Sequence, residues 1–455
     1  MTDNSDLSGQ NVVSFPEHRR PFSLGQALDD RKSATPKSDE ILAKARELDL
    51  LSTYNCTFDY NLYRNLELRY ADKVIRGGIV MKTAFRLVNS HSTCQQCLYA
   101  FEIDTYGRGC IHDCTYCYAK AELTVHGYWN NPVPAPVDIN EIRKAFYLTF
   151  ETSKKHKWSE VLARRIPLRI GSMSDSFMWT DKKYGVTREL LKILNHYQYP
   201  YIIFTRSDLI AEDEYMSLLN KNLASIQFSL SSTNEKLTRL IEPGAPSPKR
   251  RLRALKKLSE EKFWTTVRLN PFFPIFPDGY FSDPNFSWKG AVPKFDFSSF
   301  EMIDEVADHA VPAVLAGFVR LSSFSINKIE KSAGINLRQF YNREAVLKSA
   351  RDWHFSDREI RSYYERLKQR AISKGMEFTT CYIGNGESHF WKDQDLWSNK
   401  KDCCNVKDRV SSFVRDSREV AFENRLKFTH QKNLKPESQF LYHPLGSMPE
   451  VERSL

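Results

Sequence analysis

Three cysteines stand close together in the segment TYGRGCIHDCTYCYAK, residues 105–120. They are Cys110, Cys114 and Cys117, spaced four and then three residues apart. Thiolates are soft ligands that suit zinc or iron–sulfur clusters. Three of them supply three of the four ligands that a cubane cluster takes, and the fourth iron stays open to an exogenous ligand. The spacing therefore predicts a [4Fe–4S] cluster with one open iron.

The alternative for this motif is a zinc site or a set of buried thiols. His112 lies inside the motif and would complete a zinc site as a fourth ligand. Zinc knuckles and ribbons, however, usually consist of paired two-residue spacings. A four-then-three spacing on a loop after a strand is unlike them, so the pattern favours the cluster.

Short apolar runs alternate with amphipathic helical patterns from residue 99 onward. The runs predict strands at 99–106, 167–173, 200–206, 224–231, 264–273, 313–323 and 376–381. The patterns between them predict helices at 187–197, 212–222, 248–262 and 356–375. Strands separated by helices indicate βαβ units and a parallel sheet, either open or rolled into a full or partial barrel. Active sites of such sheets lie beyond the carboxyl ends of the strands, and the cysteine motif directly follows the first one.

The flanks of this repeated pattern differ from it in composition. Residues 1–40 lack periodicity and are expected to be a disordered arm, followed by an N-terminal extension at 41–98. The α/β core is expected at 99–385, and a C-terminal extension at 386–455. The segment MTDNSDLSGQ after the start is polar, and no run approaches ~18 apolar residues, so we expect a cytoplasmic protein without a membrane span.

The cysteine motif resembles the CxxxCxxC signature of the radical S-adenosylmethionine superfamily. Its expanded form GCIHDCTYCYA resembles the spore-photoproduct-lyase-like branch, often labelled DNA repair photolyases. The segments LRIGSMSDSF (168–177), IIFTRSDLI (202–210) and TVRLNPFFP (266–274) follow in the order of that branch. The resemblance covers residues 99–325, and it implies a partial (β/α)6-type TIM-like barrel with N- and C-terminal extensions.

The resemblance also implies the cofactors and the reaction. Cys110, Cys114 and Cys117 would hold a [4Fe–4S] cluster whose fourth iron is chelated by S-adenosylmethionine. An external electron donor of the flavodoxin or ferredoxin type would supply the electron that cleaves S-adenosylmethionine to a 5′-deoxyadenosyl radical. That radical would abstract hydrogen from a substrate.

Four residues near the motif and the second strand would bind S-adenosylmethionine by this resemblance. Tyr116, before the third cysteine, matches the aromatic position whose backbone meets the adenine. Ser172 and Ser174 fall where the family binds the amino group. The glycine-glycine-glutamate of the family is absent there, and Asp175 is the nearest acid.

Four further residues at strand ends complete the expected cofactor site. Ser229 and Ser231 end the fourth strand, where the family often binds ribose hydroxyls, and Arg268 and Asn270 lie on the fifth, within expected reach of the carboxylate. A guanidinium suits that role because it binds carboxylates through two parallel hydrogen bonds. The ordinary reading of a serine at a strand end is a cap or turn residue.

A second group of cysteines remains outside the motif. Cys94 and Cys97 have the two-residue spacing of a metal knuckle, and Cys403 and Cys404 are adjacent. Together the four would form a site for zinc or an auxiliary iron–sulfur cluster; the alternative is ordinary buried thiols. Cys381 ends the last predicted strand, where a thiol would be placed to donate a hydrogen atom to a substrate radical.

Two features of the sequence bear on the substrate, its net charge and one basic helix. The formal charge of +10 and the basic helix at 248–262 fit nucleic acid, although a basic amphipathic helix more commonly has a solvated outer face. Three classes of function stay open: a radical enzyme acting on nucleic acid, the same machinery acting on a peptide or small metabolite, and a non-catalytic zinc or cluster-binding interaction protein.

Overall fold

A computed structural model of the 455-residue chain gives the fold. It describes residues 88–89, 99, 101–107, 109–125, 129, 134–275, 297–335, 337–348, 352–381, 390–398, 402–407 and 409–410. The expected arm at 1–40 and almost all of the expected extension at 41–98 lie outside these residues.

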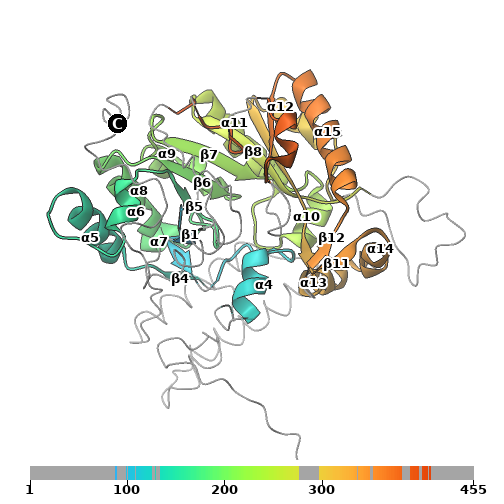
Figure 1. Ribbon diagram of the computed structural model, residues 1–455, viewed down its shortest axis with the longest axis horizontal. Coiled ribbons are helices and arrows are strands. Elements are labelled where there is room, and N and C mark those ends of the chain that lie inside the picture. Colours follow the sequence, from blue (N-terminus) through green and yellow to red (C-terminus); the bar gives the residue numbers. More distant parts are fainter. Residues whose placement is uncertain are drawn as a thin grey trace, which may run out of the picture.

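The described residues contain one large sheet that runs through the molecule (Figure 1). Its strands, in spatial order, are β1 (Val88–Asn89), β2 (Phe101–Ile103), β5 (Leu168–Ile170), β6 (Tyr201–Thr205), β7 (Ala224–Ser229), β8 (Trp264–Phe272), β9 (Ala313–Phe318) and β13 (Glu377–Thr380). All neighbours from β2 to β13 are parallel, and only β1 is antiparallel, to β2. Each of the seven strands predicted from the sequence is confirmed as one of these parallel strands. The fold is a mixed α/β partial barrel, as expected.

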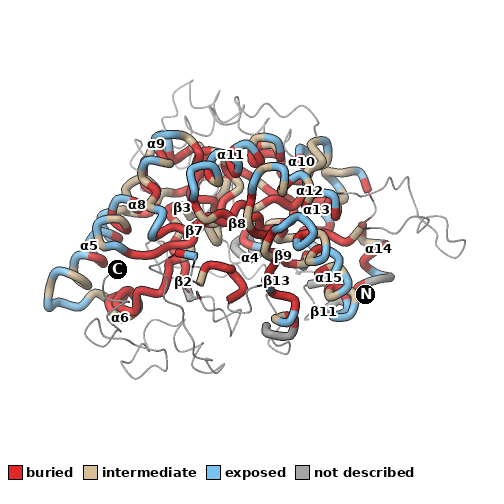
Figure 2. Tube along the Cα trace, turned by 90° about the horizontal axis from the view of Figure 1, so that it is seen from above, coloured by how far each residue is buried: buried red, intermediate tan, exposed pale blue. Residues whose placement is uncertain are grey.

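Buried apolar side chains explain why the central strands form. The run Tyr201–Thr205 is buried at four of its five positions, and Ala224–Ser229 is buried at five of six. Strands covered by helices read as nearly continuous apolar segments because both faces are shielded from water. Figure 2 shows these strands buried, whereas the surrounding helices alternate buried and exposed residues.

Helices connect the parallel strands. They are α4 (Tyr118–Val125), α5 (Ile139–Phe150), α6 (Ser159–Ala163), α7 (Asp181–Tyr184), α8 (Val186–His196), α9 (Asp213–Met216), α10 (Glu235–Ile241), α11 (Pro248–Glu260), α12 (Met302–Ala307), α13 (Ser323–Ala333), α14 (Leu337–Glu344) and α15 (Asp357–Ser373), with 3-10 turns η3 (Asp208–Ala211) and η5 (Phe390–Leu396). None of the helices described is long and apolar enough to cross a membrane.

The helix expected at 212–222 is shorter than predicted, because only α9 is helical there and turns follow it, whereas α11 and α15 begin and pack as their sequences indicate. In α11, Pro248 lies in the first turn, where its missing N–H costs nothing, and Leu252, Leu255 and Leu258 face the core. In α15, the side chain of Ser356 accepts the backbone N–H of Glu359 at 3.2 Å, which caps the helix start.

Two small sheets accompany the main one. The first has the order β10 (Leu321–Ser322), β12 (Asp352–His354) and β11 (Val346–Lys348), all antiparallel. The second pairs β3 (Tyr106–Gly107), which lies just before the cysteines in the chain, with β4 (Ala135–Pro136), which lies after them.

The carboxyl ends of the parallel strands meet at one edge of the main sheet, which we call the mouth of the barrel. Polar and thiol-bearing residues follow the strands there: Asp104 after β2, Ser172 after β5, Arg206 after β6, Ser231 after β7 and Cys381 after β13. This is the edge at which α/β enzymes of this topology place their ligands.

A segment of the expected C-terminal extension packs against the opposite, amino-terminal ends of the strands. Asn405 accepts a hydrogen bond at its carbonyl oxygen from Nε1 of Trp264, the first residue of β8, at 2.9 Å. The carbonyl oxygen of Cys404 accepts one from Nε2 of Gln227 at 3.3 Å. Residues 402–407 therefore lie beside the floor of the partial barrel.

Candidate metal centre at the mouth of the barrel

The cysteine motif forms a loop between β3 and α4 that rests on the turn after α10. The backbone N–H of Thr115 donates to the carbonyl oxygen of Ile241 at 2.9 Å, and the backbone N–H of Gly244 donates to the carbonyl oxygen of His112 at 3.1 Å. A Cβ on Gly244 would lie 1.8 Å from the carbonyl oxygen of Ile111. The loop can approach this turn so closely only because residue 244 has no side chain.

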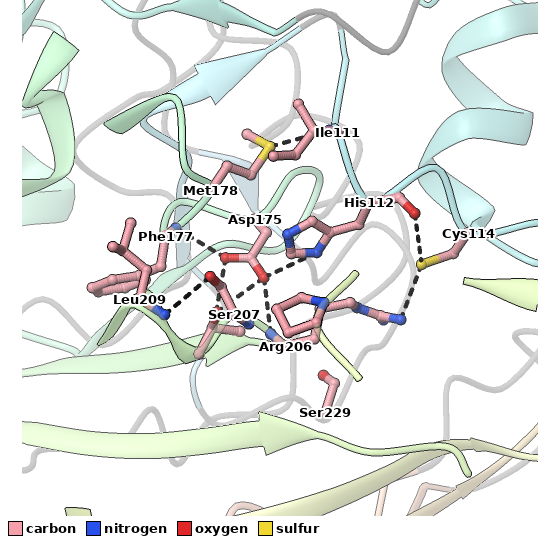
Figure 3. A network of polar contacts seen from close by, with 12 residues as sticks. Ile111, His112, Cys114, Asp175, Phe177, Met178, Arg206, Ser207, Leu209 and Ser229 are labelled. Carbon is pink, nitrogen blue, oxygen red and sulfur yellow. Dashed lines mark hydrogen bonds and ion pairs between the residues drawn. The ribbon is translucent and has the colours of Figure 1, made fainter. Parts of the chain in front are cut away.

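The three thiols of the loop lie at the mouth of the barrel, and hydrogen-bond donors point at two of the sulfurs, those of Cys114 and Cys117. Cys114 is buried, and Cys110 and Cys117 are partly buried. Nη1 of Arg206 lies 3.1 Å from Sγ of Cys114 (Figure 3), and the backbone N–H of Lys120 donates to Sγ of Cys117 at 3.4 Å. Donors of this kind stabilise the charge on thiolates that bind iron–sulfur clusters.

Burial raises the pKa of each of these three thiols, that of Cys110 to about 12. A bound cation reverses this effect, because its charge stabilises the thiolate that coordinates it. Three soft sulfur ligands on one partly open loop, each able to hold a different iron, fit a cluster that keeps one iron free.

The arrangement does not favour the zinc alternative. The ring of His112 points toward Asp175, with Nδ1 3.6 Å from Oδ2 of that carboxylate, and it is the backbone carbonyl of His112 that faces Sγ of Cys114 (Figure 3). Within the described part of the chain, no three His, Cys, Asp or Glu side chains are grouped closely enough to hold a single metal ion. A tetrahedral zinc site needs such a group around one ion, whereas a cubane distributes its thiolates over separate irons.

A buried ionic network connects the thiol of Cys114 to the interior. Arg206 contacts Oε1 of Glu242 at 3.1 Å and the hydroxyl of Tyr116 at 2.7 Å. Tyr116 also hydrogen-bonds Glu242, and the other oxygen of that carboxylate pairs with Arg251. Glu242 therefore has two arginine partners, one on each carboxylate oxygen.

The charges of this network stabilise one another. Burial by itself would raise the pKa of Glu242, but Arg251 and Arg206 bring it below its ordinary value, so the carboxylate stays ionised. Burial raises the pKa of Tyr116 well above its ordinary range, so the phenol stays protonated. Its ring packs edge-on to Phe273 at 5.5 Å. The expected role of the Tyr116 backbone toward an adenine is not tested by these contacts.

Asp175 has a supporting position in this structure. Its oxygens accept the hydroxyl of Thr205 at 2.8 and 2.9 Å and the backbone N–H groups of Phe177 and Arg206 at 2.9 and 2.8 Å (Figure 3). With both oxygens engaged, the carboxylate joins the turn after β5 to the end of β6.

The turn after β5 is held by a different acid, Asp104. Its Oδ2 accepts the backbone N–H of Met173 at 3.1 Å. Burial raises the pKa of Asp104 to about 7. Of the expected amino-group ligands, Ser174 donates its hydroxyl to the carbonyl oxygen of Tyr106 at 2.6 Å, while the buried hydroxyl of Ser172 has no hydrogen-bond partner among the described residues.

The expected ribose and carboxylate ligands are distributed around the same interior. Ser231 lies 3.3 Å from the hydroxyl of Tyr116, and the carbonyl oxygen of Ser229 accepts a hydrogen bond from Arg251 at 3.4 Å. Nη1 of Arg268 donates to Oε1 of Gln227 at 2.6 Å.

Arg268 and Asn270 are both on the interior-facing side of β8. The guanidinium of Arg268 lies over the ring of Phe204 at 4.4 Å, and Asn270 packs where a Cβ on Gly317 would lie 2.6 Å from its Cγ. Glycine at 317 therefore provides the room that the Asn270 side chain occupies.

The remaining cysteines separate into two places. Cys381 is partly buried at the mouth, where its N–H donates to Ala316 at 2.7 Å. Cys403 and Cys404 are buried at the floor, where a hydrogen bond from Cys403 lowers the pKa of Cys404. Cys94 and Cys97 lie outside the described residues, so the four-cysteine site stays a prediction.

Sequence reasoning missed Asp104 and Arg251. Asp104 had a usable signal, because an acid directly after a buried strand enters the mouth of the barrel. The sequence contains no such signal for Arg251. It is one of six cations in the basic helix, and only the folded chain shows that its side chain is fully buried.

A family model matches the part of the chain that carries this site. Residues 105–281 match the model of the Radical SAM superfamily. The chain is similar to an uncharacterized protein of Acidianus two-tailed virus, 27% identical over 36% of this chain and 54% of that one. An uncharacterized protein of Methanocaldococcus jannaschii is 28% identical over 37% of this chain and 60% of that one. The chain thus spans little more than half the length of these relatives.

Two solved structures are similar at lower identity. A spore photoproduct lyase double mutant with bound AdoMet and dinucleoside spore photoproduct has a TM-score of 0.45 at 14% identity, covering 79% of this chain and 96% of that one. Streptococcus suis SuiB bound to S-adenosylmethionine has a TM-score of 0.38 at 12% identity, covering 78% and 63%. The match to the Radical SAM superfamily model begins just before the cysteine loop and includes strands β5 to β8, so it covers the part of the chain that carries the candidate site.

Proposed function

We propose that this chain is a radical S-adenosylmethionine enzyme in which Cys110, Cys114 and Cys117 hold a [4Fe–4S] cluster. The observation that carries the proposal is the placement of the three thiols on one loop at the mouth of the barrel, with N–H donors on the sulfurs of Cys114 and Cys117. When bound, the cluster would supply the electron that cleaves S-adenosylmethionine to a 5′-deoxyadenosyl radical.

The residues of the chain would then bind and orient the reactants. The turn at 171–174, held by Asp104, would present its polar groups to the amino group of S-adenosylmethionine. Arg268 would face the carboxylate, because the residue is 8% exposed and its guanidinium donates to the neutral amide of Gln227. Cys381 is the proposed hydrogen donor, since it follows β13 at the same mouth.

Release of 5′-deoxyadenosine tests this proposal. The full chain would be reconstituted anaerobically with iron and sulfide, then given dithionite as the reductant and S-adenosylmethionine. We expect 5′-deoxyadenosine by liquid chromatography, and we expect Cys114→Ala to lose both the product and bound iron. Cys56→Ala, a change of the same residue type outside the motif, is the matched control and should keep both.

Two results would contradict the proposal. One is a Cys114→Ala variant that still releases 5′-deoxyadenosine. The other is an iron-loaded wild-type chain that releases none, which would favour the alternative of a non-catalytic cluster-binding protein.

For the substrate we propose nucleic acid, supported by the formal charge of +10. The basic helix α11 adds little to this, because several of its cations are paired with acids. Arg250 pairs with Asp208 at 2.7 Å, and Lys257 with Asp213 at 2.6 Å. A nucleic acid would therefore bind at the mouth of the barrel rather than along α11.

Oligonucleotide binding as a function of salt tests the substrate class. Binding to phosphates releases counterions, so the logarithm of the affinity should fall linearly with the logarithm of the salt concentration. A slope near zero would contradict nucleic acid and favour a peptide or a small metabolite. The electron donor is proposed to be of the flavodoxin or ferredoxin type.

A further inference from the structure

Arg206 makes an unusual set of contacts at the cysteine loop. Nη1 of its guanidinium lies 3.1 Å from Sγ of Cys114, 2.7 Å from the hydroxyl of Tyr116 and 3.1 Å from Oε1 of Glu242 (Figure 3 shows the first). Its side chain is 17% exposed. A permanent positive charge is thus held against the sulfur of one of the three proposed cluster ligands, in a place that water largely does not reach.

The position of this guanidinium is strongly constrained. Glu242, 1% exposed, contacts Arg206 through one carboxylate oxygen and Arg251 through the other. Arg251 is fully buried, and its Nε donates to the carbonyl oxygen of Pro246 at 2.7 Å. The backbone N–H of Arg206 donates to Oδ2 of Asp175 at 2.8 Å. Contacts at both ends of the residue therefore keep its side chain next to Cys114.

We propose that Arg206 is a positioning residue that raises the reduction potential of the cluster, an inference that rests on the proposed function. Reduction adds one electron and makes the cluster and its thiolates more negative. A fixed cation that donates a hydrogen bond to a ligand sulfur stabilises the reduced form more than the oxidised form. The reduced state is the one that must form before S-adenosylmethionine can be cleaved.

Glu242 acts in the opposite direction in this arrangement. Its carboxylate lies against Arg206 and offsets part of the positive charge near Cys114. Replacing it with glutamine keeps the shape and one oxygen acceptor but removes the negative charge. Loss of the Arg206 charge should therefore lower the potential, and loss of the Glu242 charge should raise it.

An anaerobic redox titration of the reconstituted full chain tests this inference. Dithionite supplies one electron to each cluster, no bond is formed or broken, and the reduced cluster is quantified by electron paramagnetic resonance. For Arg206→Gln we expect the equilibrium constant for reduction to fall about ten-fold, which is about 59 mV for a one-electron couple. Arg206→Lys keeps the positive charge but lacks the planar guanidinium. Its reduction potential should therefore lie between those of the wild type and Arg206→Gln.

Glu242→Gln should shift the potential in the positive direction. The matched control is Arg250→Gln, an identical change of charge on the outer helix α11, where Arg250 pairs with Asp208. Its potential should equal that of the wild type. Iron content of every variant is measured beside the potential, so that a loss of cluster is not read as a change in potential.

Equal potentials in the wild type and Arg206→Gln would overturn the inference, as would shifts of the same sign in Arg206→Gln and Glu242→Gln. If Arg206→Gln takes up no iron, Arg206→Lys and Glu242→Gln decide the question by the same signs. A wild-type chain that takes up no cluster refutes the proposed function and this inference together. If the wild-type chain cleaves S-adenosylmethionine but the variants have the same reduction potential as the wild type, only this inference is refuted.

Discussion

Replacing Asp104 with asparagine should remove a pH dependence of stability from this protein. Asp104 follows β2 and accepts the backbone N–H of Met173 at the mouth of the barrel. Burial raises the pKa of its carboxyl from 3.8 to about 7, although backbone N–H groups of residues 171–174 oppose the shift. The acid is therefore mostly neutral in the folded chain under mildly acidic conditions, and it ionises as the pH approaches and passes 7.

The sign of the effect follows from proton binding. Between the two pKa values the folded chain binds more protons at this site than the unfolded chain does, so the free energy of unfolding falls as the pH rises. The favourable contribution is complete below a pH of 3.8 and is lost as the pH rises through about 7. A raised pKa of this size corresponds to about 4 kcal/mol over the whole window.

Urea unfolding of the metal-free chain, followed by tryptophan fluorescence, measures this contribution. Asp104→Asn cannot ionise, so its stability relative to wild type should rise by about 3 kcal/mol between about pH 5 and about pH 8. The matched control is Asp213→Asn on α9. Lys257 holds the pKa of that exposed carboxyl below its ordinary value, so the control should show no change in this window.

Parallel pH profiles of the wild type and Asp104→Asn would refute the reasoning. They would show that the carboxyl ionises in the folded chain at its ordinary pKa, and hence that Asp104 is hydrated rather than buried under the turn at 171–174.

Three further predictions concern the cysteine loop, the C-terminal segment around Trp397 and the second group of cysteines. Gly244→Ala should lose iron uptake on reconstitution, because its Cβ would meet backbone atoms of the cysteine loop at 1.8 Å; Gly375→Ala, with nothing within 4 Å, should keep its iron and lose roughly 1–2 kcal/mol of stability to its positive φ. Trp397→Ala, which removes a fully buried ring, should cost roughly 3–5 kcal/mol in urea unfolding; an unchanged midpoint would show that this C-terminal segment is not part of the core. Metal analysis of a variant with all three motif cysteines changed to alanine should find residual zinc or iron if the second site exists, and none if those thiols are merely buried.

Much of the fold and the central part of the candidate site could be predicted from the sequence. The seven predicted strand ranges each contain a parallel strand, because a strand buried on both faces is a local apolar run. The spacing of Cys110, Cys114 and Cys117 can likewise be read within a few residues of sequence. The position of this motif directly after the first predicted strand can be read in the same way. Chemistry carried by neighbouring residues on one loop can be read without knowing how the chain folds.

The partners of the charged residues could not be read in this way. Only the folded chain brings Arg206 to Cys114, 92 positions away in the sequence, and assigns Arg251 to Glu242 rather than to solvent. Only the folded chain directs Asp175 into the turn and brings the partly buried Asp104 to the backbone of Met173. Strand order and the direction of each side chain decide these contacts, and both depend on how the whole sheet packs. The sequence by itself therefore determined which chemistry the cysteine loop carries, and the tertiary structure decided which charges surround it, because electrostatic partners are chosen by distance in space.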